Sequence, residues 1–112
     1  MQGFLMARLD IYKNLGAGKA KTPFVLDVQN HHLGDFGRRV VIPLIRTSEF
    51  PQENLPRDLA PKFEIQGIEV MLQPVYMASV PDSALGEKVG ALANTNAEYS
   101  VTSALDRLFG RC

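Results

Sequence analysis

Residues 95–110 read Thr-Asn-Ala-Glu-Tyr-Ser-Val-Thr-Ser-Ala-Leu-Asp-Arg-Leu-Phe-Gly, and this stretch decides the fold class. Thr95 followed three residues later by Glu98 matches a capping box, which satisfies the free amides at the start of a helix. Gly110 is placed to end that helix, because glycine readily adopts the left-handed conformation of a helix cap. Between them an apolar stripe recurs at helical spacing: Ala97, Val101, Ala104, Leu105 and Leu108.

Upstream of this predicted helix the apolar pattern changes to a period of two, which is typical of strands. Ala7, Leu9 and Ile11 alternate with polar or aromatic neighbours, and residues 24–29 repeat the pattern. Residues 38–45 form a third predicted strand. Pro43 inside it has no amide hydrogen for the ladder, so we expect this strand to lie at a sheet edge or to carry a bulge.

The middle of the chain predicts a hairpin and several loops. Residues 62–65 and 68–74 flank Gln66-Gly67, and a two-residue connection ending in glycine suits a tight turn. Residues 14–22 are rich in Gly, Lys and Ala and predict a mobile loop, and residues 76–92 predict short strands at the rim. No alternation of strands and helices occurs. We therefore predict an α+β fold, mainly antiparallel β, as a small barrel-like sheet with one C-terminal α-helix.

The length and the charge of the chain limit the possible domain organisations and functions. The 112 residues support one domain with one core. Twelve Lys and Arg balance twelve Asp and Glu, which weighs against direct nucleic-acid binding, because such proteins usually carry a basic excess. Residues 1–46 carry a net +4 and residues 47–112 a net −4. These halves either offset each other in the fold or form two opposite faces.

The sequence also predicts where the protein works. The single cysteine, Cys112, allows no internal disulfide and fits a reducing cytoplasm. No apolar stretch reaches the 18 residues of a membrane span, and residues 1–8 have no apolar region of a secretory signal. We expect a cytoplasmic protein, in which either Met6 is an alternative start or residues 1–6 are a loose extension.

The sequence contains only weak candidates for phosphate-binding, metal-binding or catalytic motifs. Gly16-Ala17-Gly18-Lys19 fails as a phosphate loop, because the required earlier glycine is Lys13 and no hydroxyl residue follows Lys19. His31-His32 has no further Cys or His to complete a metal shell, so we expect no metal and no cofactor. Arg38-Arg39 either contacts phosphate or alternates one exposed and one paired side chain. The absence of a catalytic set favours a protein that acts by binding.

An ordered set of motifs resembles the CcdB family of plasmid-type toxins over about residues 7–112. No single piece is specific, but their order and spacing match. The pieces are Leu26-Asp27-Val28-Gln29, Gly37-Arg38-Arg39-Val40-Val41-Ile42-Pro43-Leu44, Met77-Ala78-Ser79-Val80-Pro81, Leu85-Gly86-Glu87 with Val89, and Ala104-Leu105-Asp106-Arg107-Leu108-Phe109.

The resemblance implies a fold and a function. The fold is a small SH3-like barrel sheet with one C-terminal helix, shared with the MazF and Kid ribonuclease toxins, in a single toxin domain over 1–112. The function is that of a non-catalytic homodimer, serving plasmid maintenance, that binds the A subunit of DNA gyrase and traps it on cleaved DNA. A CcdA-like antitoxin neutralises the toxin, and the complex represses its own operon through DNA contacts supplied by the antitoxin.

The resemblance also implies a gyrase-binding surface, formed by the chain end and the loop after the Asp-Val-Gln strand. The best-known family member ends in aromatic-Trp-Gly-Ile, and the family carries paired isoleucines in the loop, so this chain departs at both places. Charged residues in a hot spot add desolvation costs unless the partner offers counter-charges. The implied gyrase-binding residues here are His32, Leu33, Asp106, Phe109, Gly110, Arg111 and Cys112.

Two alternatives stay open. One is a MazF-like sequence-specific endoribonuclease, in which Arg38 or Arg39 contacts phosphate and His31 or His32 acts as acid or base. The other is a CcdB homologue that folds and dimerises but no longer targets gyrase. For the dimer, we expect the apolar stripe of the C-terminal helix, or the strand ending near Pro43, to supply much of the buried patch.

Overall fold

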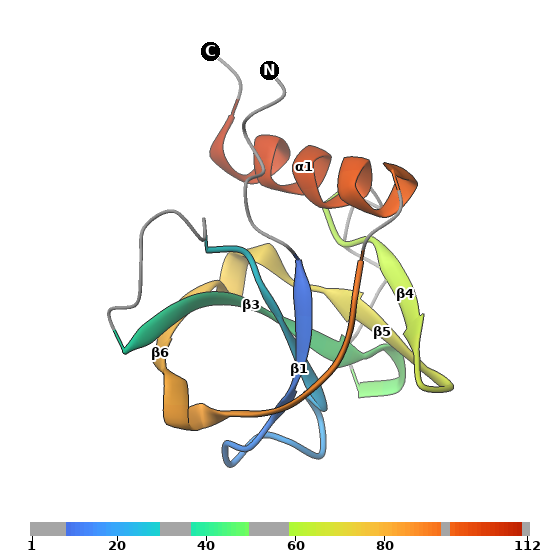
Figure 1. Ribbon diagram of the computed structural model, residues 1–112. Coiled ribbons are helices and arrows are strands. Elements are labelled where there is room, and N and C mark those ends of the chain that lie inside the picture. Colours follow the sequence, from blue (N-terminus) through green and yellow to red (C-terminus); the bar gives the residue numbers. More distant parts are fainter. Residues whose placement is uncertain (1–8, 30–36, 50–58, 93–94, 111–112) are drawn as a thin grey trace.

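The computed structural model describes residues 9–29, 37–49, 59–92 and 95–110, which form one curled sheet and one long helix (Figure 1). Three short 3-10 turns, η3 (Thr47–Glu49), η4 (Pro74–Tyr76) and η5 (Asp82–Ala84), connect strands. The strands are β1 (Asp10–Asn14), β2 (Phe24–Asp27), β3 (Arg38–Arg46), β4 (Lys62–Ile65), β5 (Ile68–Leu72), β6 (Ala78–Pro81) and β7 (Leu85–Ala91). The helix is α1 (Thr95–Phe109).

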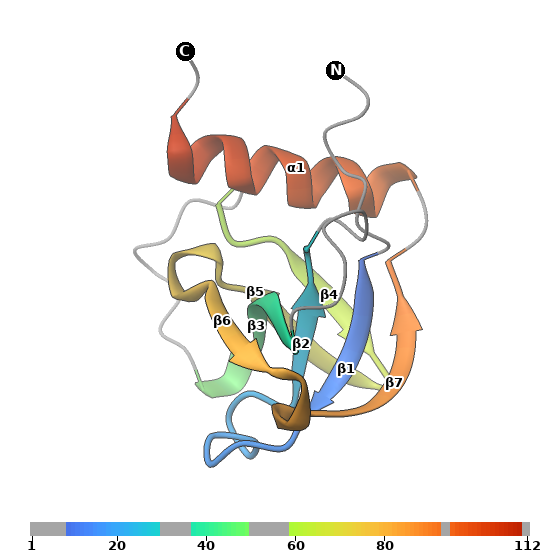
Figure 2. The ribbon, with the colours of Figure 1, turned by 60° about the vertical axis from the view of Figure 1, so that its left-hand side comes forward.

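All pairings within the sheet are antiparallel. The strand order is β4-β5-β3-β2-β1-β7, and β6 pairs with β3 beside this path. The sheet curls into a half-barrel, and α1 lies across one end of it (Figures 1 and 2). The predicted fold class, antiparallel β with one C-terminal helix, is confirmed.

The predicted hairpin forms at Gln66-Gly67. Ile65 pairs with Ile68, and the two turn residues have φ angles of 52° and 80°. Two successive positive φ angles match the two-residue turn whose twist suits adjacent antiparallel strands. Gly67 accepts this conformation without the steric cost that a Cβ brings.

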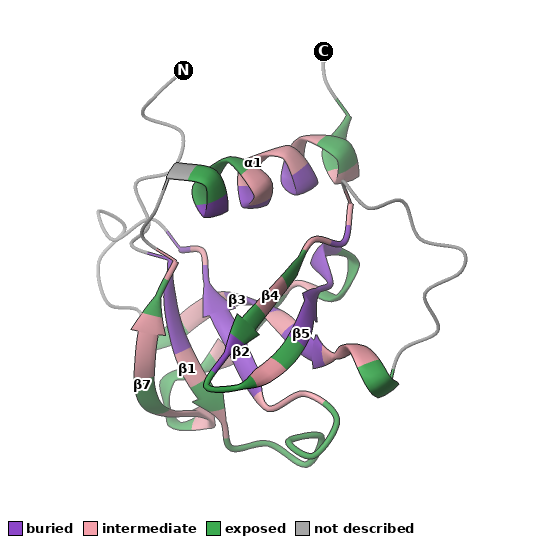
Figure 3. Ribbon diagram, turned by 90° about the vertical axis from the view of Figure 1, so that its right-hand side faces the viewer, coloured by how far each residue is buried: buried purple, intermediate pink, exposed green. Residues whose placement is uncertain are grey.

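The predicted apolar stripe of α1 packs onto the protein's own sheet (Figure 3). Val101 and Ala104 are fully buried, and they join a core cluster with strand residues such as Leu26 and Ile42. Of the two expected dimer patches, the stripe is therefore wrong, because the chain's own core already covers most of it. The other, the strand ending near Pro43, stays a prediction. The helix bounds themselves, Thr95–Phe109, match the predicted ones.

Pro43 corrects a second expectation, since β3 is a central strand of the sheet. On one side of β3, Pro43 pairs with Val25 of β2. On the other side β3 pairs with β6 over Arg38–Val41 and with β5 over Leu44–Arg46, so Pro43 falls where the partner strand changes. A missing amide hydrogen costs least at such a change of partner, and the Pro43 carbonyl still accepts a hydrogen bond from the Gln73 amide at 3.1 Å.

The predicted loop at 14–22 is a series of turns held from within. The Asn14 side-chain amide donates to the Thr22 carbonyl at 2.9 Å, and the Thr22 amide donates to the Gly18 carbonyl at 2.8 Å. Its predicted mobility stays a prediction. Among the described residues, no helix is long and apolar enough to cross a membrane.

The two oppositely charged halves meet where β1 pairs with β7. Lys13 of the first half lies 3.4 Å from Glu87 of the second, and Lys88 lies 3.3 Å from Asp10. The first contact joins a base of the basic half to an acid of the acidic half, whereas the second joins an acid of the basic half to a base of the acidic half. This strand pair therefore does not decide between halves that offset each other and two opposite faces.

Candidate functional site

The C-terminal end of α1 presents an exposed aromatic side chain next to a helix stop. Phe109 is 69% exposed, although an apolar side chain of this size is usually covered. Gly110 follows with a φ of 79°, and its amide donates to the Asp106 carbonyl at 2.8 Å. This left-handed glycine ends the helix as predicted and fixes Phe109 on the last turn.

Three of the seven predicted gyrase-binding residues lie together at this end. Asp106 is half-buried one turn before Phe109, and Gly110 closes the helix. His32, Leu33, Arg111 and Cys112 lie outside the described residues, so their predicted role stays a prediction. The implied surface is thus described only in its helical part.

A second exposed aromatic residue on α1 was not among the predicted site residues. Tyr99 is 72% exposed and lies seven residues before Asp106, so the two share the outer face of the helix. Helical spacing places Tyr99 opposite the apolar stripe, so the sequence alone indicates that this aromatic side chain is exposed. Beside α1, the 3-10 turn η4 packs against the helix and exposes Val75 and Tyr76.

An ion pair between a buried carboxylate and a partly exposed guanidinium lies on the face of the sheet away from α1. Arg39 Nε and Nη2 both donate to Asp27 Oδ2, at 3.1 and 2.6 Å. Asp27 is 3% exposed, and its other oxygen accepts the Gln29 amide at 2.9 Å. Burial by itself would lower the pKa of Arg39, but the hydrogen bonds and negative charge of Asp27, with smaller effects of Tyr12 and Asp82, raise it overall.

Arg38 and Arg39 therefore have different roles. Arg38 is exposed, and its guanidinium donates to the hydroxyl and the carbonyl of Ser79, both at 2.8 Å, across the β3–β6 pairing. Arg39 is held by Asp27. The interpretation that the pair alternates one exposed and one paired side chain is confirmed. Arg39 thus links β3 to β2, and Arg38 links β3 to β6. The roles of Arg38, Arg39, His31 and His32 in the ribonuclease alternative stay a prediction, and His31 and His32 lie outside the described residues.

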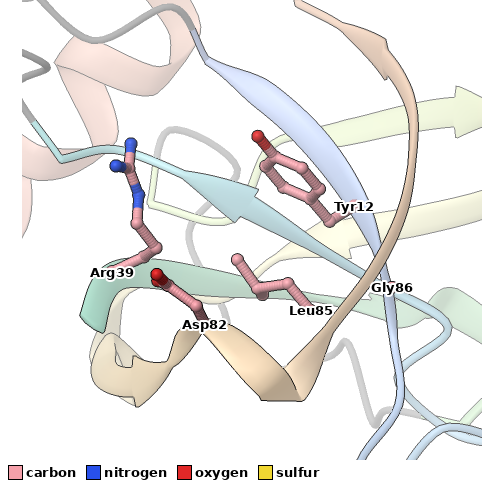
Figure 4. A pocket seen from close by; sticks show the side chains of 5 residues that line it. All are labelled: Tyr12, Arg39, Asp82, Leu85 and Gly86. Carbon is pink, nitrogen blue, oxygen red and sulfur yellow. The ribbon is translucent and has the colours of Figure 1, made fainter. Parts of the chain in front are cut away.

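A cavity of about 430 Å³ opens beside this ion pair. It is lined by Tyr12 of β1, Arg39 of β3, Asp82 of η5, and Leu85 and Gly86 of β7 (Figure 4). The Asp82 amide donates to the Gly37 carbonyl at 2.9 Å, which fixes Asp82 next to the start of β3. Sequence reasoning missed this cavity, because strand pairing assembles it from four separate elements.

No group of three or more His, Cys, Asp or Glu side chains that could hold a metal ion occurs in residues 9–29, 37–49, 59–92 and 95–110. The carboxylates of Asp10 and Asp27 are each bonded to a basic side chain instead.

Comparison with known protein families shows which family the chain belongs to. The sequence model of the CcdB protein family matches residues 8–110, nearly the whole chain. The chain belongs to the CcdB family. CcdB is a family of non-enzymatic toxins, and membership supports a toxin of the toxin–antitoxin type for this chain. The match includes Asp106, Phe109 and Gly110 but not the last two residues, Arg111 and Cys112.

Proposed function

We propose that this CcdB-family toxin binds the A subunit of DNA gyrase and traps the enzyme on cleaved DNA. The observation that carries the proposal is Phe109, a 69% exposed aromatic side chain held on the last turn of α1 by the left-handed Gly110. Protein–protein hot spots centre on aromatic anchors that enter a pocket of the partner. Phe109 has the exposure and the fixed position that such an anchor needs.

The half-buried carboxylate of Asp106 lies on the same side of α1, one turn earlier. A charge close to the anchor costs desolvation energy unless gyrase supplies a cation or a hydrogen-bond donor. His32, Leu33, Arg111 and Cys112 complete the proposed surface.

The remaining parts of the proposal come from the family. The toxin acts as a homodimer, a CcdA-like antitoxin neutralises it, and the toxin–antitoxin complex represses its own operon through DNA contacts of the antitoxin. The gene that lies upstream tests this arrangement: a short reading frame with a basic DNA-binding start and an acidic or disordered end would support it.

The growth assay that tests the proposal uses two exposed aromatics of the same helix. Induction of the wild-type chain in bacteria is expected to arrest growth and to accumulate gyrase–DNA cleavage complexes. Phe109→Ala is expected to abolish both effects, whereas Tyr99→Ala, two to three turns away, keeps them. Growth arrest with intact DNA would contradict the gyrase target, and in that case purified protein incubated with RNA tests the ribonuclease alternative.

The alternative of a homologue that has lost gyrase binding has its own test. If the wild-type chain does not bind gyrase, replacing Arg111-Cys112 with Gly-Ile shows whether the chain end is the cause. Restored binding then assigns the loss to these two residues, and tight binding by the wild-type chain rules the alternative out.

A further inference from the structure

The cavity beside the Asp27–Arg39 pair lies on a different face of the protein from the end of α1. Ile11 of β1 points into the core beneath α1, so the next residue, Tyr12, points to the opposite face of the sheet. Figure 4 shows side chains from β1, β3, η5 and β7 converging on this one opening. The proposed gyrase surface uses none of the residues that line it.

The charges around the cavity leave one negative charge in excess. Arg39 is already engaged by Asp27 through two hydrogen bonds. The carboxylate of Asp82 is exposed at the rim. Its charge also acts on Arg39, but this is the smallest of the effects that raise the pKa of that arginine, well behind those of Asp27. The neighbouring Lys88–Asp10 pair adds no net charge. The single cation Arg39 thus lies near two carboxylates, Asp27 and Asp82. The excess negative charge lies on Asp82, the carboxylate that solvent reaches.

The uncharged lining complements a cation with an apolar stem. The Tyr12 ring and the Leu85 side chain line the same opening as Asp82. Lysine and arginine cover apolar surface with their methylene chains while the charged end stays at a polar site. An aromatic face also attracts a cation placed over it.

We propose that this cavity receives the basic side chain, arginine or lysine, of a protein partner, with Asp82 as the ion-pair acceptor and Tyr12 as the aromatic wall. The volume of about 430 Å³ accommodates one long side chain with part of its backbone. A nucleotide is the other ligand that a cavity lined by Arg, Asp and Tyr suggests. Its phosphate, however, would add negative charge to a site that already holds an excess, so the charge balance favours the basic side chain.

The proposal is tested by amide chemical-shift titration of the full chain at low ionic strength. The probes are the blocked tripeptide Gly-Arg-Gly, its counterpart Gly-Gln-Gly and guanosine monophosphate. Gly-Arg-Gly is expected to shift the amides of Leu85 and Gly86 in a saturable way, and Gly-Gln-Gly to leave them unchanged. Absence of saturable shifts with Gly-Arg-Gly, or saturation of the same amides by the nucleotide alone, would overturn the proposal.

Matched variants separate a specific site from general charge attraction. Asp82→Asn is expected to weaken tripeptide binding about three- to fivefold, as loss of one partly exposed ion pair implies. Asp82→Glu is expected to keep binding, because it restores the carboxylate. Glu64→Gln, an exposed residue on β4 with the same change of charge, is expected to have no effect. Equal weakening by Glu64→Gln and Asp82→Asn, or none by Asp82→Asn, would contradict the assignment.

Discussion

Replacing Arg39 with alanine is expected to destabilise the fold strongly. The substitution removes two charge-assisted hydrogen bonds, at 3.1 and 2.6 Å, from Asp27. It leaves the buried carboxylate of Asp27 without the cation that neutralises it. The free energy of unfolding should therefore fall substantially.

The size of the loss follows from the burial of the two partners. Breaking a fully buried ion pair by removing one partner costs about 3–5 kcal/mol. The Asp27 side chain is 5% exposed but that of Arg39 is 24% exposed, so water partly reaches the site. We therefore expect the loss near the lower end, about 2–3 kcal/mol, or roughly 10 °C in Tm for a domain of this length.

Arg38→Ala is the matched control in the same strand. The Arg38 guanidinium bonds Ser79 at the exposed surface, so its loss should cost about 1 kcal/mol or less. Both variants are compared with wild type by urea unfolding at one fixed protein concentration, followed by circular dichroism. Equal losses for the two arginines, or a loss below about 0.5 kcal/mol for Arg39→Ala, would refute the reasoning.

Three further predictions concern the core, the hairpin and pH. Val101→Ala removes two methyl groups from a fully buried position, so thermal unfolding should show a loss of about 1–2 kcal/mol; an unchanged Tm would place α1 off the sheet. Gly67→Ala puts a Cβ on a residue with a φ of 80° and should cost about 1 kcal/mol or more, whereas Gly18→Ala, whose Cβ meets nothing within 4 Å, should cost less. Because the pKa of Arg39 is raised, its stabilising contribution is fully present below the unfolded-state pKa and is lost only as pH rises through the folded-state pKa. The stability difference between wild type and Arg39→Ala should therefore be constant from about pH 7 to pH 9, and a decline over this range would contradict the assignment.

Local sequence patterns were enough to predict those parts of the structure that depend on interactions between neighbouring residues. The change from a period of two to helical spacing located α1, and Gln66-Gly67 located the hairpin turn. The same local logic placed Phe109 and Gly110 at the end of the helix, where the structure has them. These features depend on residues only a few positions apart.

Long-range pairing explains what the sequence could not show. Alternation in β2 marks Asp27 as a polar position, yet Arg39, twelve residues later, holds it in a buried ion pair. Pro43 was expected at an edge because one strand cannot show that its partner changes from β6 to β5 along its length. The cavity at Tyr12 and Asp82 likewise exists only after four elements have assembled.

The central claim is that the Phe109 end of α1 binds gyrase, and calorimetric titration of the purified full chain into the gyrase A subunit tests it most directly. The wild-type chain is expected to bind the gyrase A subunit in a saturable way. Phe109→Ala should weaken it at least about tenfold, as loss of a hot-spot anchor implies, and Tyr99→Ala should leave it unchanged. No binding by the wild-type chain, or equal binding by wild type and Phe109→Ala, would contradict the account.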